Sequence, residues 1–230
     1  MKFNSFNRII LAIVCFCIPA IQQAVYAQVT VSGMFTSGMV LQQNSEASIW
    51  GWANPSDTIA VTGSWNNKTV KTATDSNKKW TLKLSTPAAK TDGTSYTITI
   101  KGTNTILLNG VLIGEVWLLS GQSNMEMPLE GWGGAPVEGS TQAISSANYP
   151  NIRLLIIGKK SVATPQSNIV RNGTDGVWTG CSPGTVKQFS AVGYFFGKEI
   201  FSKLNIPIGL VQSAWGGSSC ETWANSASLQ

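Results

Sequence analysis

Apolar and polar side chains alternate along residues 28–108, and this period of two predicts β-strands. The alternation is clearest in residues 80–85 (WTLKLS) and 96–101 (YTITIK). Further short strands are predicted at residues 48–52, 58–62 and 69–72. Clusters of Asn, Asp, Gly and Pro separate these segments. Short alternating strands with frequent turns predict an all-β sandwich over residues 28–108.

Beyond residue 108 the apolar positions run continuously, which is typical of strands covered on both faces. Such strands are predicted at residues 111–119, 152–157 and 208–214. A helix is predicted over residues 191–204, where Ser190 can cap the first turn, and a second should begin near Glu221. Alternating strands and helices predict an α/β domain over residues 109–230. Three strands and one clear helix are too few for its core, so we expect this domain to be incomplete at its C-terminal end.

Residues 1–27 have the pattern of a secretory signal peptide. Lys2 and Arg8 precede an apolar stretch over residues 9–20, and Ala27 ends a small-residue cleavage site. The stretch is short for a bilayer span, so a retained anchor is the less favoured alternative. We therefore expect a secreted or periplasmic protein with no membrane contact once the signal is removed.

The charge balance argues against a nucleic-acid-binding protein. Of the 16 Lys and Arg residues, two lie in the signal, which leaves 14 against 11 acidic residues and no basic cluster. Few charges and many Thr, Ser, Asn and Trp residues favour a protein that handles neutral polar material such as sugars. Cys181 and Cys220 could form a disulfide in an oxidising compartment, although nothing in the sequence shows that they are close.

Residues 120–125 (SGQSNM) directly follow the apolar run 116–119. A buried strand that ends in such a turn can present one hydroxyl at the rim of a sheet, where α/β hydrolases hold their nucleophile. Met125 stands where the Gly-x-Ser-x-Gly elbow needs glycine, so this turn is not the ordinary hydrolase elbow. Ser123 is therefore either a nucleophile, which needs a base to take its proton, or a helix-capping serine.

Four segments match one known pattern in the same order. Residues 114–129 (GEVWLLSGQSNMEMPL) resemble the nucleophile block of the sialate O-acetylesterase family, a branch of the SGNH (GDSL-like) hydrolases. The N-terminal β-domain of that family resembles residues 38–42 (GMVLQ) together with 49–53 (IWGWA). Two later blocks of its catalytic domain resemble residues 189–197 (FSAVGYFFG) and 206–217 (IPIGLVQSAWGG).

The resemblance implies a β-domain followed by part of a flavodoxin-like α/β domain of the SGNH type. It implies hydrolysis of O-acetyl esters of sialic acids, with Ser123 as the nucleophile. An acetylxylan-type esterase of the same superfamily is an alternative. A non-catalytic secreted carbohydrate-binding protein is an alternative from another class. No metal or organic cofactor is expected, because the chain has no His and its cysteines do not form a zinc motif.

An ester-cleaving serine also needs hydrogen-bond donors aimed at the developing oxyanion. The backbone N–H of Ser123 is the first candidate. The Gly216-Gly217 turn is the second, because it follows the strand 208–214 and should lie at the same sheet edge. The side chain of Gln212 is the third. The alternative is that these residues are an ordinary turn and a polar strand position.

Polar and aromatic residues near the motif are candidates for substrate contacts. They are Gln122, Asn124, Glu126 and Trp215. Fixing the turn is the favoured alternative for Asn124. The side chains of Trp132, Trp178 and Trp223 could also stack on a sugar, although aromatic residues are more often part of a core.

The general base of the family is a histidine near the C-terminal end of the catalytic domain, and this chain contains none. No Lys lies near Ser123 in the sequence to replace it, and Asp175 is more typical of a turn residue. We therefore expect the 230-residue chain alone to have little or no esterase activity, because the base must come from outside these residues.

Overall fold

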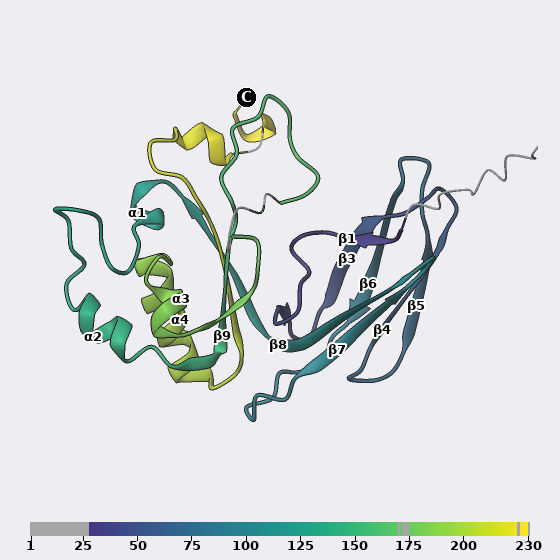
Figure 1. Cartoon of the computed structure of the whole chain (residues 1–230), viewed down its shortest axis with the longest axis horizontal. Helices are drawn as coiled ribbons and strands as arrows, with labels where there is room; N and C mark the ends of the chain where they lie inside the picture. The colour runs from purple at the N-terminus through teal and green to yellow at the C-terminus, as the bar shows by residue number, and fades with distance from the viewer. Residues whose placement is uncertain (1–27, 170, 172–174, 225, 230) are drawn as a thin grey trace, which may run out of the picture.

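The computed structural model describes residues 28–169, 171, 175–224 and 226–229, so the predicted signal peptide lies outside the described residues. Strands dominate the fold, and the helices belong to its C-terminal half (Figure 1). The strands are β1 (Thr30–Val31), β2 (Val40–Gln42), β3 (Glu46–Trp52), β4 (Thr58–Gly63), β5 (Thr69–Ala73), β6 (Lys79–Ser85), β7 (Tyr96–Lys101), β8 (Thr105–Gly121), β9 (Tyr149–Ile156), β10 (Thr179–Cys181) and β11 (Ile208–Ala214). The helices are α1 (Ser123–Glu126), α2 (Ser140–Ser145), α3 (Pro183–Val186) and α4 (Ala191–Leu204), with the 3-10 helices η1 (Cys220–Trp223) and η2 (Ser226–Leu229).

The strands of residues 28–108 lie in two sheets. One sheet has the order β1-β3-β6, and β5-β4-β7 form an antiparallel series that continues into β8. Side chains alternate between buried and exposed along β6, where Trp80, Leu82 and Leu84 point into the core. The period-two pattern therefore predicted β3, β4, β5, β6 and β7 to within two residues at each end. No helix interrupts this part of the chain.

One long strand connects the two halves of the molecule. β8 pairs first with β7, then with β2 and finally with β11. The predicted boundary at residue 108 falls inside this strand (Figure 1). Gly114 and Glu115 break the apolar run but not the strand, because the Glu115 N–H donates to the Pro207 carbonyl at 3.0 Å.

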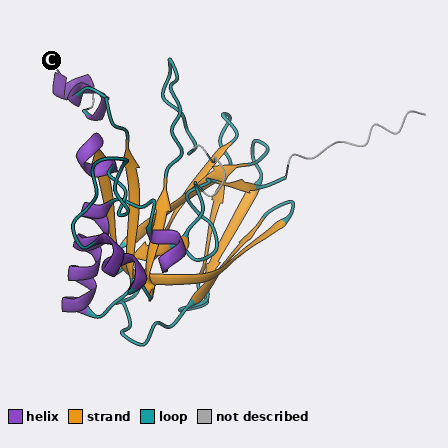
Figure 2. Cartoon of the chain, turned by 60° about the vertical axis from the view of Figure 1, so that its left-hand side comes forward, coloured by secondary structure: helices purple, strands orange, loops and turns teal. Residues whose placement is uncertain are grey.

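The C-terminal half is built on the parallel strands β9, β11 and β8, with β10 antiparallel at the edge. α4 begins and ends where the sequence predicted, and the Ser190 hydroxyl caps it by accepting the Gly193 N–H at 3.0 Å. Gly193 brings α4 close to the sheet, since a Cβ there would lie 2.2 Å from Leu119. Figure 2 shows the helices gathered around the strands of this half.

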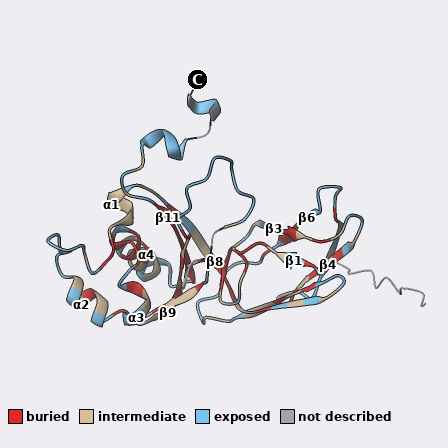
Figure 3. Cartoon of the chain, turned by 45° about the horizontal axis from the view of Figure 1, so that its top comes forward, coloured by how far each residue is buried: buried red, intermediate tan, exposed pale blue. Residues whose placement is uncertain are grey.

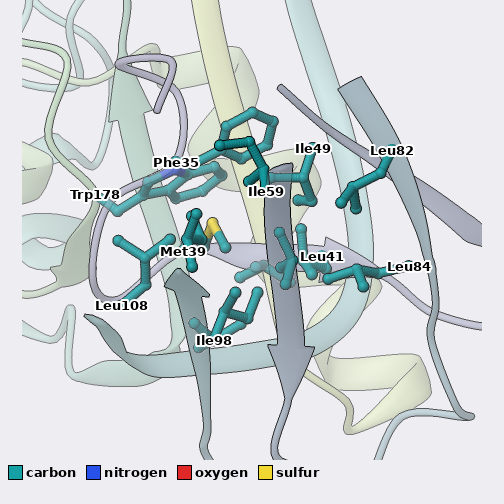
Figure 4. Packing of buried hydrophobic residues seen from close by; sticks show 14 of the residues in the cluster. Phe35, Met39, Leu41, Ile49, Ile59, Leu82, Leu84, Ile98, Leu108 and Trp178 are labelled. Atoms are coloured by element: carbon teal, nitrogen blue, oxygen red, sulfur yellow. The ribbon is translucent and has the colours of Figure 1, made fainter. Parts of the chain in front are cut away.

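Apolar side chains from both halves share one core. Trp178 is 7% exposed, packs in the same cluster as Phe35 and Met39, and donates its indole N–H to the Met34 carbonyl at 2.9 Å (Figure 4). The prediction that Trp178 could stack on a sugar is wrong, because its ring is buried at this joint. A second cluster joins α4 to β9 and β11, whereas η1 is exposed (Figure 3).

The end of β8 has one open edge. Among the described residues, β11 pairs with Glu115–Gly121 and no strand pairs with the opposite side of that segment. Leu118 is 67% exposed there, and Trp117 is also exposed. Within the described part of the chain, no helix is long and apolar enough to cross a membrane.

Candidate active site

The predicted nucleophile lies at the point where β8 turns into α1. Gly121 adopts φ +146°, a conformation that a side chain would disfavour, and Ser123 opens the single helical turn that follows. The Gln122 carbonyl accepts the backbone N–H groups of Met125 and Glu126 at 3.0 and 2.9 Å. This local bonding holds Ser123 half-buried at the carboxyl end of β8.

The neighbouring strand ends at the same edge. Ala214 of β11 pairs with Gly121, and the chain then turns through Gly216 and Gly217. A Cβ added to Gly216 would lie 3.4 Å from the Cβ of Ser123, so the Gly216 backbone packs directly against the serine. Within the described residues, the N–H groups of Ser123 and Gly217 donate to no acceptor.

A carboxylate fixes the glycine turn. Glu126 accepts the Gly216 N–H with one oxygen and forms an ion pair with Lys159 through the other. Partial burial alone would raise the pKa of Glu126, but the bonds from Lys159 and Gly216 and the charge of Lys159 lower it below its ordinary value. Lys159 also lies 5.9 Å from the centroid of the Trp215 ring. Glu126 thus connects α1, the Gly216 turn and the segment after β9.

The Gly216 amide provides a direct measure of this contact. Protonation of Glu126 should weaken the hydrogen bond and move the amide proton resonance upfield. Because the pKa of Glu126 is lowered in the fold, this contribution to stability is complete above the unfolded-state pKa and is lost as the pH falls through the folded-state value. We expect an NMR titration of the Gly216 amide to have its midpoint below the usual range of glutamate, and a Lys159→Met variant to raise that midpoint. An unchanged midpoint in the variant would contradict the assigned ion pair.

A cavity of about 530 Å³ opens beside this turn. Glu126 and Ala214 form part of its wall, so it adjoins the Ser123 turn, while the ends of β9 and β11 supply further lining. Burial raises the pKa of Asp175 in the cavity wall, an effect that the charge of Lys159 partly offsets. Within the described residues, no group of three or more His, Cys, Asp and Glu side chains could hold a metal ion.

Comparison with known proteins identifies the family. The model of the family described as "Carbohydrate esterase, sialic acid-specific acetylesterase" matches residues 113–229. The chain belongs to this family. It is 30% identical over 205 residues to the sialate O-acetylesterase of Homo sapiens and 31% identical over 206 residues to that of Rattus norvegicus. Each match covers 84% of this chain, and the chain spans 38% and 36% of the length of these two relatives.

A solved structure supports the same assignment. A carbohydrate acetylesterase from Xanthomonas citri is 33% identical and superposes with a TM-score of 0.78. The match covers 88% of this chain and 44% of the other. The family resemblance expected from the sequence is therefore confirmed, and the chain is an esterase-family polypeptide built mostly of β-structure.

The structure distinguishes among the predicted oxyanion donors of this esterase-family chain. The Gly216 N–H already binds Glu126, whereas the amides of Ser123 and Gly217 are uncommitted in the described part of the chain. Gln212 is 5% exposed, and its Oε1 accepts the Ser190 N–H at 2.8 Å, which ties β11 to the start of α4. Gln212 therefore has a structural role, as the acceptor that connects β11 to α4, and its position in the predicted strand gave no indication of this role.

The residues predicted to contact substrate also differ in their exposure and in their hydrogen-bond partners. Gln122, Asn124 and Trp215 are exposed around the turn, and their contact with substrate stays a prediction. Glu126 lines the cavity, but both of its oxygens have partners in the chain, which favours a positioning role.

Lys159 is the residue that sequence reasoning missed. It lies 33 positions from Glu126 in the chain, and the fold brings the two side chains into contact. Lys159 follows the predicted parallel strand 152–157 by two residues. Because the carboxyl ends of parallel strands meet at one edge of a sheet, this position could have indicated that Lys159 lies near Ser123. Lys159 does not replace the missing base, because its ammonium group donates to Glu126 and offers no acceptor.

The two described cysteines are free thiols. Burial raises the pKa of Cys181 to about 12, an effect that Lys198 opposes weakly, whereas Cys220 is exposed. Since the thiolate is the reactive form, iodoacetamide at pH 8 should label Cys220 in the folded chain and Cys181 only in urea. Peptide mass spectrometry separates the two sites. Equal labelling in the folded chain would contradict the buried position of Cys181.

Proposed function

We propose that this chain carries the nucleophile half of a serine esterase that removes O-acetyl groups from sugars. Ser123 Oγ attacks the acetyl carbonyl, and the negative charge that develops on the carbonyl oxygen is received by the N–H groups of Ser123 and Gly217. A general base takes the Ser123 hydroxyl proton and returns it to the sugar oxygen, which leaves as an alcohol; water then attacks acetyl-Ser123, releases acetate and restores the serine. The observation that carries the proposal is the packing of the Gly216 backbone against Ser123, with those two amides uncommitted within the described residues.

The general base of this reaction lies outside the 230 residues. No His is present, and Lys159 is bound to Glu126. Two features of β8 support this view. Among the described residues no strand pairs with its outer edge beyond Gly114, and on the sheet face the apolar side chain of Leu118 is 67% exposed. Without the base, only the weak catalysis of the oxyanion donors should remain.

We also propose a division of the chain into a signal peptide and two domains. Residues 1–27 are a secretory signal, residues 28–108 a β-sandwich, and residues 109–230 the first part of an SGNH-type domain. The sheet order β1-β3-β6 facing the β5-β4-β7-β8 series, and the parallel order β9-β11-β8, support the second and third assignments. The signal-peptide assignment can be tested by mass spectrometry of the exported protein, whose first residue should be Gln28.

The relatives do not fix which sugar is used. Those named above are sialate O-acetylesterases, and the solved neighbour is a carbohydrate acetylesterase. We take an O-acetylated sugar as the substrate class of the whole protein.

Acetyl transfer to the protein tests this function. Without a base, the chain should turn over p-nitrophenyl acetate no faster than its Ser123→Ala variant. Prolonged incubation should nevertheless acetylate Ser123 in preference to the exposed Ser120, three residues earlier in β8, because of the two only Ser123 has the amide donors. Equal acetylation of both serines would contradict the nucleophile assignment. Rapid turnover that Ser123→Ala abolishes would show a base within the chain.

A further inference from the structure

The turn that follows β11 carries one of the two proposed oxyanion donors, the Gly217 N–H. The Ser218 N–H donates to the Trp215 carbonyl at 3.4 Å and closes the turn, and Gly217 adopts φ +79° at its third position. Two consecutive glycines give such a turn little stiffness of its own, because glycine populates many backbone conformations. Contacts from outside the turn must therefore set the direction of the Gly217 N–H.

A carboxylate holds the peptide group between Trp215 and Gly216 at its N–H. The Gly216 N–H donates to one oxygen of Glu126, and the other oxygen pairs with Lys159. Hydrogen bonds to an ionised acceptor are stronger than those between neutral groups. Glu126 and Ser123 belong to the same short helix, α1, so this bond ties the glycine turn to the segment that carries the nucleophile.

A hydroxyl holds the same peptide group at its carbonyl. The Ser218 hydroxyl donates to the Trp215 carbonyl at 2.6 Å and accepts the indole N–H of Trp223 at 2.9 Å. Because both polar atoms of the peptide group between Trp215 and Gly216 are bonded, the plane of that group is fixed. The Gly217 N–H belongs to the next peptide group along the chain, so its direction depends on that plane.

We propose that Glu126 and Ser218 are positioning residues that direct the Gly217 N–H toward the carbonyl oxygen of an acetyl group on Ser123. The inference rests on the proposed esterase function and assigns the residues that hold its oxyanion site. Each acts through the peptide group that precedes the Gly217 amide. Removing either bond frees that group, lets the Gly217 N–H turn away, and leaves the acetyl carbonyl with the Ser123 N–H alone.

The order of the turn can be measured before any acetylation takes place. The ¹H–¹⁵N heteronuclear NOE of the Gly217 amide in the unreacted 230-residue chain reports its motion on the picosecond to nanosecond timescale. We expect the value of an ordered backbone in the unsubstituted chain and lower values in Glu126→Ala and in Ser218→Ala. Ser219→Ala is the matched control and should keep the unsubstituted value, because the Ser219 hydroxyl pairs with Thr222 instead of the turn.

The acetylated chain gives a second measurement. Because the base is absent, acetyl-Ser123 formed with p-nitrophenyl acetate should persist, and hydrogen bonds from the oxyanion donors should lower the stretching frequency of its carbonyl. A ¹³C label in the acetyl carbonyl isolates this band in infrared difference spectra, with the Ser123→Ala chain as the background.

The two positioning residues should move this band in the same direction. We expect it at higher wavenumber in Glu126→Ala and in Ser218→Ala than in the unsubstituted chain. Ser218→Thr keeps a hydroxyl and should restore the original frequency, and Ser219→Ala should not change it. A loss of stability alone would leave the band in place. Ser218→Ala removes one hydroxyl outside both core clusters, so it tests the inference even where Glu126→Ala fails to fold.

An unchanged Gly217 NOE in the folded variants would overturn the inference, and so would a carbonyl band that is insensitive to them. In the second case acetyl-Ser123 has formed, so the positioning role fails while the nucleophile assignment stands. Absence of any acetyl group on Ser123 would instead contradict the proposed function. The NOE values would then still decide whether Glu126 and Ser218 hold the turn.

Discussion

Replacing Gly114 with alanine is expected to lower the free energy of unfolding by about 3 kcal/mol or more. A Cβ at this position would lie 1.8 Å from the Pro207 carbonyl oxygen, which is backbone and cannot rotate away. β11 would have to move away from β8 at the point where the two strands begin to pair. Urea denaturation followed by tryptophan fluorescence measures the change.

A glycine in open space is the matched control for this substitution. Gly133 has no atom within 4 Å of a Cβ position and does not require a positive φ, so Gly133→Ala should change stability by less than about 0.5 kcal/mol. Equal stability of the two variants would show that the close approach of β8 and β11 is not as described. The same pairing of β8 with β11 brings Gly216 to Ser123. A Gly114→Ala variant of unchanged stability would therefore also contradict the described arrangement of Gly216 and Ser123.

Removing the indole of Trp178 should destabilise the chain by about 3–5 kcal/mol. The ring is buried among side chains from both halves, and its N–H bonds the Met34 carbonyl. Trp178→Ala therefore leaves a cavity and an unpaired carbonyl at the joint between the sheets. Thermal unfolding monitored by circular dichroism gives the effect.

Trp223 provides the comparison for Trp178, since it is 36% exposed in η1 and belongs to neither core cluster. Trp223→Ala should change stability by less than about 1 kcal/mol. Similar losses in the two variants would contradict the role of Trp178 as the residue that joins the halves.

Local patterns in the sequence predicted the regular elements well. The alternation around Trp80 and the continuous apolar run over 208–214 each matched a strand, because burial on one or both faces dictates those patterns directly. The cap at Ser190 likewise predicted the start of α4. The second helix expected near Glu221 is only the 3-10 turn η1. Nothing in the sequence predicted β10 and α3, because elements of three and four residues are too short to show a period.

Contacts between distant segments could not be predicted in the same way. The continuity of β8 depends on Pro207, whose carbonyl accepts the Glu115 N–H although the two residues are more than ninety positions apart in the sequence. The strand ends predicted which turns meet at Ser123, but not that Glu126 would occupy the Gly216 amide. Gln212 and Trp178 were candidate site residues by type, and only their three-dimensional surroundings show that one ties β11 to α4 and the other lies in the core.

We propose that Ser123 is a competent nucleophile that lacks its proton acceptor. Supplying that acceptor from solution tests it most directly: p-nitrophenyl acetate hydrolysis is measured as imidazole is increased, for the 230-residue chain and for Ser123→Ala. Imidazole alone cleaves this ester, so the variant defines the background. We predict no difference between the two proteins without imidazole and a difference that grows with its concentration. Parallel responses at every concentration would contradict the claim.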